Sequence, residues 1–200
     1  MDFKVKEGLK LITYSSLISF LLLIYSCTPS NMLATGGGTV LVVAEGERSL
    51  GTVVDDATIK VNVAAKFLNA GNNLFVNINT TVLEGRVLLT GLVENQEIRI
   101  DAVRLVWEID GVIEVINEIE IGDRATIKDY ANDLLINTQA KGVAAKTIGL
   151  RAVAFNFETI NGKIYIAGVS SKQEQIEKLI DALKSIKGVK EIINYVIIKE

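Results

Sequence analysis

The chain has 200 residues, 49% of them hydrophobic, and contains no histidine and a single cysteine. The lack of histidine excludes Ser-His-Asp and Cys-His catalysis and the usual zinc sites, and one cysteine excludes a disulfide within the chain. The net charge of −3 makes nucleic acid a poor partner. The apolar content suffices for one mid-sized domain or two small ones, held together by their cores alone.

Residues 1–26 have the pattern of a secretory signal. Three lysines (Lys4, Lys6 and Lys10) precede an apolar run at 11–24, which is too short to cross a bilayer comfortably as a helix. Leu23-Ile24-Tyr25-Ser26-Cys27 resembles a bacterial lipobox. The resemblance implies cleavage before Cys27, acylation of Cys27, and, with Thr28 next, the outer membrane. The alternative is a plain signal-anchor with a chance cysteine.

Residues 27–54 are expected to link the lipidated cysteine to the folded part. Gly36-Gly37-Gly38 predicts flexibility. The lysine and Ser/Thr that a phosphate-binding loop needs after its glycines are absent. The apolar segment 39–44 is too short for a second membrane span, but is long enough to pack on the first folded unit.

The remainder contains two copies of one unit, related by a single constant shift along the chain. All three glycines of the unit recur without a gap, as do Asp56 at Asp133 and Asn117 at Asn194. The glycines are Gly85, Gly91 and Gly111 in the first copy and Gly162, Gly168 and Gly188 in the second. This repeat predicts two domains, at residues 55–122 and 126–199.

Each unit is expected to begin with a helix followed by a hairpin. The helices are predicted to start near Asp55-Asp56, and near Asn132-Asp133 or as early as Thr126, with the aspartates as caps. Extended runs follow at 74–82 and 87–93, and at 150–159 and 164–169. Glu84-Gly85 and Asn161-Gly162 supply the turns, because both central positions need positive φ.

A second helix and a last strand are expected to complete each unit. Apolar residues share one helix face in both copies, and Ser171 with Glu174 predicts a capping box. Gly111 and Gly188 are expected to stop the helices, before strands at 112–121 and 189–198. The predicted class is α+β, with two helices on a small three-stranded mixed sheet in each unit.

The repeated unit resembles the BON domain, and the whole layout resembles the dual-BON outer-membrane lipoproteins. The resemblance rests on residues 85–91 and 162–168 and on the closing segments 111–117 and 188–194. It implies a periplasmic, lipid-anchored protein that binds phospholipid and helps maintain the envelope. It implies neither catalysis nor a cofactor or metal.

In that family the first helix of the second unit is thought to contact anionic lipid. The matching segment here is 128–146, and the candidate membrane-binding residues are Tyr130, Leu134, Leu135, Lys128, Lys141 and Lys146. Apolar side chains beside lysines suit an interfacial helix. The alternative is that the apolar residues are core. Ile136 is expected in the core, whereas Leu134 and Leu135 match Ala57 and Thr58, and so are apolar only in the second copy.

A protein-interaction module that docks an envelope assembly or a peptidoglycan enzyme is the second candidate function. Residues 27–124 carry a charge of −7 and residues 125–200 a charge of +3. The acidic half, with Asp55, Asp56 and residues 118–123, would supply the docking surface. Trp107 is either a contact or an inter-unit packing residue, with packing preferred. A small-ligand site between the units stays open.

Overall fold

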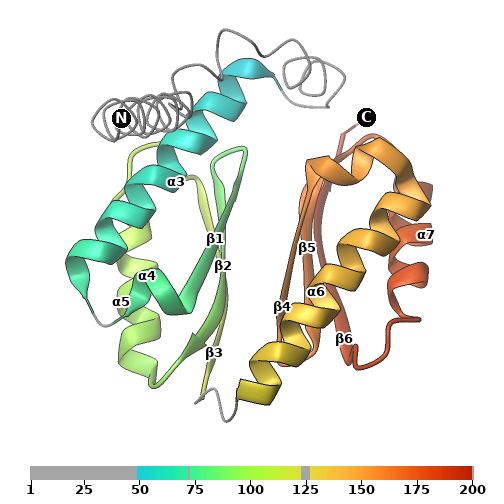
Figure 1. Ribbon diagram of the computed structural model, residues 1–200. Helices are drawn as coiled ribbons and strands as arrows, with labels where there is room; N and C mark the ends of the chain where they lie inside the picture. Colours follow the sequence, from blue (N-terminus) through green and yellow to red (C-terminus); the bar gives the residue numbers. More distant parts are fainter. Residues whose placement is uncertain (1–48, 72, 123–126, 200) are drawn as a thin grey trace, which may run out of the picture. The chain divides into compact units, whose positions relative to one another are not determined.

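The computed structural model describes residues 49–71, 73–122 and 127–199 (Figure 1). The expected signal, Cys27 and nearly all of the expected linker lie outside these residues. The described residues all belong to one compact unit. Within the described ranges, every helix is too short or too polar to span a bilayer.

The first repeat runs helix, strand, strand, helix, strand. Its long helices are α3 (Leu50–Ala70) and α5 (Gln96–Trp107), and a short turn of helix, α4 (Leu74–Asn77), precedes the sheet. The strands are β1 (Ile78–Leu83), β2 (Arg86–Val93) and β3 (Glu114–Ile121). β2 lies in the centre, antiparallel to β1 and parallel to β3.

The second repeat has the same order. It comprises α6 (Ile127–Ile148), the 3-10 helix η2 (Gly149–Ala154), β4 (Phe155–Ile160), β5 (Lys163–Ser170), α7 (Gln173–Leu183) and β6 (Glu191–Ile198). The strand register is also repeated, since Ile78 pairs with Gly91 and, at the equivalent positions of the second repeat, Phe155 pairs with Gly168. The α+β class and the two mixed sheets are therefore confirmed.

The start of α3 differs from the prediction, whereas α6 begins at Ile127, next to the earlier of its two expected starts, Thr126. α3 begins at Leu50, where the Ser49 side chain accepts a hydrogen bond from the N–H of Thr52 at 3.1 Å. Asp55 and Asp56 thus lie inside the helix, and the prediction that they cap it is wrong. Asp133 lies inside α6 in the same way.

Three further local predictions are corrected. Residues 74–77 and 149–154 are helical turns and not strand, so each first strand is shorter than expected. The N-cap of α7 is Lys172, with no side-chain capping bond, so the Ser171 capping box is absent. Gly111 and Gly188 do have positive φ (87° and 95°), but they lie four to five residues after the helices end.

In each repeat the two long helices cover one face of the sheet (Figure 1). The cores are apolar and closed around the helix-facing side of the central strand. The first contains Ile59, Val63, Phe67, Val87, Leu89, Ala102 and Val106, and the second contains Ile136, Ala140, Ala144, Ile164, Ile166, Leu179 and Leu183. Each repeat thus has a complete core of its own.

The central strands are buried on both faces. Every residue of segments 87–93 and 164–170 is buried, as their nearly continuous apolar sequence requires. A third apolar cluster accounts for the second face. It joins Leu83, Leu88 and Ile116 of the first repeat to Ala167, Tyr195 and Ile197 of the second.

Candidate functional site

An aspartate on the first helix of each repeat ties that helix to the hairpin turn. Asp56 of α3 accepts hydrogen bonds from the backbone N–H groups of Glu84 and Gly85, each at 2.8 Å. Asp133 of α6 accepts two bonds of the same length from the turn at 161–162. The turn residues have positive φ in both repeats. One carboxylate therefore satisfies two adjacent donors, and charge strengthens both bonds.

The same turn also contacts the loop before the last strand. The carbonyl oxygen of Gly85 accepts a bond from the N–H of Ile113 at 2.9 Å, and a Cβ on Gly85 would lie 2.8 Å from the carbonyl oxygen of Gly111. The second repeat has the same two distances at Gly162. Helix, turn and loop are thus fixed against one another at one end of each repeat, which explains why these glycines recur.

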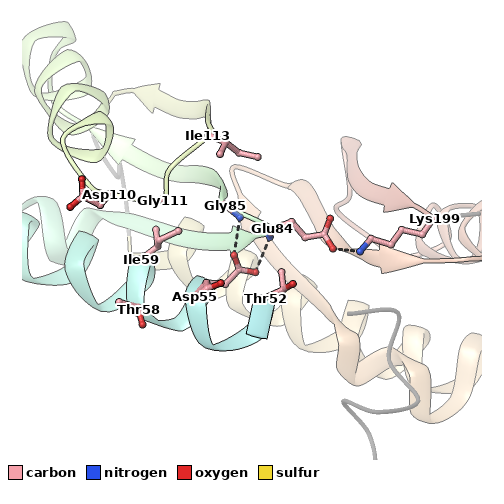
Figure 2. A pocket seen from close by; sticks show the side chains of 11 residues that line it. Thr52, Asp55, Thr58, Ile59, Glu84, Gly85, Asp110, Gly111, Ile113 and Lys199 are labelled. Carbon is pink, nitrogen blue, oxygen red and sulfur yellow. Dashed lines mark hydrogen bonds and ion pairs between the residues drawn. The ribbon is translucent and has the colours of Figure 1, made fainter. Parts of the chain in front are cut away.

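A cavity of about 670 Å³, the first cavity, lies where these three segments meet in the first repeat. Figure 2 shows it, with Glu84 and Lys199 facing each other. Four of its lining side chains are carboxylates and one is a lysine: Asp55, Asp56, Glu84, Asp110 and Lys199. Glu84 forms an ion pair with Lys199. The first cavity is thus strongly acidic.

The equivalent place in the second repeat holds a second cavity, of about 540 Å³. Its lining comes from α6, the hairpin turn and the loop before β6. The residues are Asp129, Asn132, Asp133, Leu135, Ile136, Gln139, Asn161, Gly162, Lys187, Gly188 and Lys190. Two carboxylates and two lysines make its formal side-chain charges balance.

The apolar residues predicted to bind membrane lie on the outer surface of α6. Tyr130 is 52% exposed, and Leu134 and Leu135 are each 56% exposed, whereas Ile136 is 4% exposed and packs in the core. The helical period places Tyr130 and Leu134 on one side of the outer surface and Leu135 on the other, beside the second cavity. We call these three residues the α6 apolar surface.

Two of the three predicted lysines do not share the cavity that Leu135 lines. Lys141 and Lys146 are exposed, but neither lines the second cavity. Lys146 lies three helical turns beyond Leu135, about 16 Å further along α6. The side chain of Lys128 is outside the described residues.

Two lysines that sequence reasoning missed share a cavity with Leu135. Lys187 and Lys190, from the loop before β6, line the same cavity as Leu135. A signal for them was present in the repeat, since their counterparts in the first copy are Asp110 and Ile113. Such a change of charge at matching positions marks a local specialisation of one copy.

Two carboxylates of the acidic surface considered for partner docking bind to other residues of the same chain. The Tyr195 hydroxyl donates a hydrogen bond to Glu118. Glu120 accepts a bond from the Asn161 side chain and pairs with Lys163, each at 2.8 Å. Burial alone would raise the pKa of Glu120, but these two partners outweigh burial and hold the pKa below its usual value. Asp55 stays exposed.

Other candidate groups are scattered. Trp107 is 52% exposed, which argues against the preferred packing role. Burial raises the pKa of Glu158, and the nearby Lys141 and Lys60 oppose that rise. Among the described residues, no cluster of three or more acidic or cysteine side chains is placed to hold a metal ion.

Comparison with known proteins places this geometry in a family. Residues 55–123 and 132–200 each match the BON domain. The "Uncharacterized protein in gshII 5'region" of Anaplasma centrale is 35% identical over 147 residues, which are 73% of this chain and 96% of the relative. The "Outer membrane lipoprotein DolP" of Haemophilus influenzae is 30% identical over 160 residues (79% and 82%). The "Osmotically-inducible protein Y" of Escherichia coli is 27% identical over 149 residues (72% and 73%).

Proposed function

The chain belongs to the BON-domain family, and we propose that it is an outer-membrane lipoprotein whose second repeat binds the anionic surface of a phospholipid membrane through α6. The anchor would be the acylated Cys27, on the periplasmic face, and the role would be to help maintain outer-membrane integrity. The relative named "Outer membrane lipoprotein DolP", at 30% identity, supports the compartment and the anchor.

The α6 apolar surface is the observation that carries the membrane proposal. Three large apolar side chains on one helix, each about half exposed, gain free energy when they leave water for the headgroup boundary. The first repeat has Ala57 and Thr58 where α6 has Leu134 and Leu135, so core packing of this fold does not require the leucines. The basic residues nearby would each add about 1 kcal/mol at an anionic surface.

Co-sedimentation with vesicles tests this proposal. The fragment of residues 43–200 contains both cores complete, so it folds without the anchor. We expect it to bind phosphatidylcholine vesicles that contain phosphatidylglycerol, to bind pure phosphatidylcholine at least tenfold more weakly, and to lose binding on Leu135→Glu. Val61→Glu is the matched control, because Val61 is 68% exposed on the equivalent helix α3. Equal binding to both vesicle types, or none, would refute the proposal.

The anchor has a separate test in cells. Replacing Cys27 by serine is expected to move the protein from the membrane fraction to the soluble periplasmic fraction. Two acyl chains bind a membrane stably, whereas the protein surface alone adds only a few weak contacts. Unchanged membrane fractionation of Cys27→Ser would show that acylation does not hold the protein there.

A protein-interaction function is the second candidate, and one feature of α3 favours it. Val54, Val61 and Leu68 are all exposed and recur at every second helical turn, which places them along one side of the helix. Such a line suits a partner helix. Val61→Glu should then abolish a crosslink to an envelope protein without affecting vesicle binding, and Leu135→Glu should do the reverse. The absence of any crosslinked protein would dispose of this candidate.

A further inference from the structure

The two cavities have the same frame but different chemistry. Ten of the eleven lining positions of each cavity are equivalent in the two repeats. Six substitutions separate the first cavity from the second: Thr52 becomes Asp129, Asp55 becomes Asn132, Thr58 becomes Leu135, Glu84 becomes Asn161, Asp110 becomes Lys187 and Ile113 becomes Lys190. Two of these substitutions, Asp55 to Asn132 and Glu84 to Asn161, remove a carboxylate. The substitution of Thr52 by Asp129 adds one. At Lys187 an ammonium group replaces a carboxylate, at Lys190 an ammonium group is added, and at Leu135 an apolar side chain is added.

The lysines of the second cavity are uncommitted, and its carboxylates are not. Lys187 and Lys190 are exposed and form no ion pair with any described residue. Both carboxylate oxygens of Asp133 accept backbone hydrogen bonds, and Asp129 has an interaction partner as well. An anion that enters this cavity therefore meets two free ammonium groups, together with the side-chain amide of Asn132 on its wall. The side-chain amide of Asn161 already donates a hydrogen bond to Glu120.

The apolar side chain in the lining determines what kind of anion fits. Leu135 belongs both to the cavity and to the α6 apolar surface, so an anion held here lies next to a surface suited to acyl chains. A phospholipid headgroup combines a phosphate for the lysines with acyl chains for the leucine. The volume of about 540 Å³ is in the range of small-molecule sites.

We propose that the second cavity is the headgroup site of the protein, in which Lys187 and Lys190 bind the phosphate of an anionic phospholipid while Leu135 contacts its acyl region. The inference rests on the proposed membrane function and makes it specific. The headgroup is recognised by the loop before β6, which is far from α6 in sequence, and the lysines of α6 serve only the general attraction to the surface.

The first repeat supplies the substitutions for the test. The double variant Lys187→Asp/Lys190→Ile, made in residues 43–200, introduces the residues that the first cavity carries at these positions. We expect at least a tenfold loss of binding to vesicles of four parts phosphatidylcholine and one part phosphatidylglycerol, with an unchanged thermal unfolding midpoint. Lys172→Asp/Lys178→Ile is the control, because it changes the charge equally at the N-cap and in the middle of α7, outside the lining of the second cavity. It should reduce binding less than twofold.

Soluble probes distinguish a lipid headgroup from free phosphate. Amide NMR signals of Asn161 and Lys190 are expected to shift with dihexanoyl-phosphatidylglycerol below its micelle concentration, and not with inorganic phosphate at the same concentration. Equal shifts with inorganic phosphate would overturn the assignment to a lipid. Shifts of equal size at the first cavity, at Glu84 and Ile113, would overturn the assignment to the second cavity.

The outcomes separate this inference from the function on which it rests. Loss of binding in Leu135→Glu, with full binding in Lys187→Asp/Lys190→Ile, would refute the headgroup site and leave membrane binding intact. Equal losses in the two double-lysine variants would refute the site as well, since only net charge would then matter. A wild-type fragment that does not prefer anionic vesicles would refute both proposals.

Discussion

Replacing Asp56 by asparagine removes the acceptor that holds the first hairpin turn. Asp56 is 5% exposed and receives two backbone N–H donors at 2.8 Å. Asparagine keeps one acceptor oxygen, and its amide group then faces the second N–H, so two buried donors meet. The loss of one hydrogen bond to a charged group and the burial of an unpaired donor together predict destabilisation by about 3 kcal/mol. The equivalent bonds of Asp133 are more exposed, so Asp133→Asn should cost about half as much.

Urea unfolding of residues 43–200, followed by circular dichroism, measures both effects. Asp55→Asn is the matched control. It removes the same charge one residue earlier, from an exposed side chain, and should change stability by less than about 0.5 kcal/mol. Hydrogen exchange at the Gly85 amide should accelerate in Asp56→Asn and not in Asp55→Asn. If both variants change the free energy of unfolding equally, the hydrogen bonds to Asp56 do not hold the turn.

Two further predictions concern a glycine and a pair of carboxyls. Gly91→Ala should destabilise by about 3 kcal/mol, because its Cβ would lie 2.1 Å from the carbonyl oxygen of Asn77. Gly71→Ala, with positive φ but open space around it, should cost only about 1 kcal/mol; equal thermal midpoints for these two variants would contradict this. Since the pKa of Glu158 is raised by burial and that of Glu120 is lowered despite burial by Lys163 and Asn161, their glutamine variants should respond oppositely to pH. Stability linked to a raised pKa is lost as pH rises through it, and stability linked to a lowered pKa is lost as pH falls through it. Glu158→Gln should therefore stabilise the protein at pH 7 and Glu120→Gln should destabilise it, with both differences shrinking in acid; urea midpoints that move in the same direction would refute this.

The repeat and its hairpin turns were predictable because they depend on local backbone chemistry. Asn161-Gly162 and Glu84-Gly85 form turns with positive φ at both positions, and few residue pairs tolerate this conformation. Once the turns and the shift between the two copies are known, the order of elements follows. Burial of both faces of β2 likewise follows from its apolar sequence.

Helix ends and short helical turns were not predictable from the same patterns. Residues 74–77 include the strand-favouring Phe75 and Val76, yet they form α4 directly after Gly71 and Asn73, which both have positive φ. Leu74 is then buried in the first core, and its packing overrides the local strand preference. Asp56 resembles a cap because Asp is common there, but its partners are 28 and 29 residues away in sequence.

The candidate site likewise includes residues that could be predicted from sequence and residues that could not. Leu134 and Leu135 could be identified from sequence because the first repeat has small or polar residues at the matching positions. Lys187 could not be linked to them, because the link depends on the hairpin turn and the loop before β6 meeting α6 at one end of the repeat. The spacing of residues within α6 does not show which distant residues lie beside Leu135.

The duplication of one cavity within a single chain provides an internal reference for binding measurements. Any soluble compound added to the protein encounters two cavities built on the same backbone frame, at equal concentration, temperature and salt. A compound that perturbs both turns alike is responding to their shared backbone, and one that perturbs the turn at 161–162 alone is responding to the residues that differ. Selectivity can therefore be obtained from one spectrum of one sample, without a second protein as the standard.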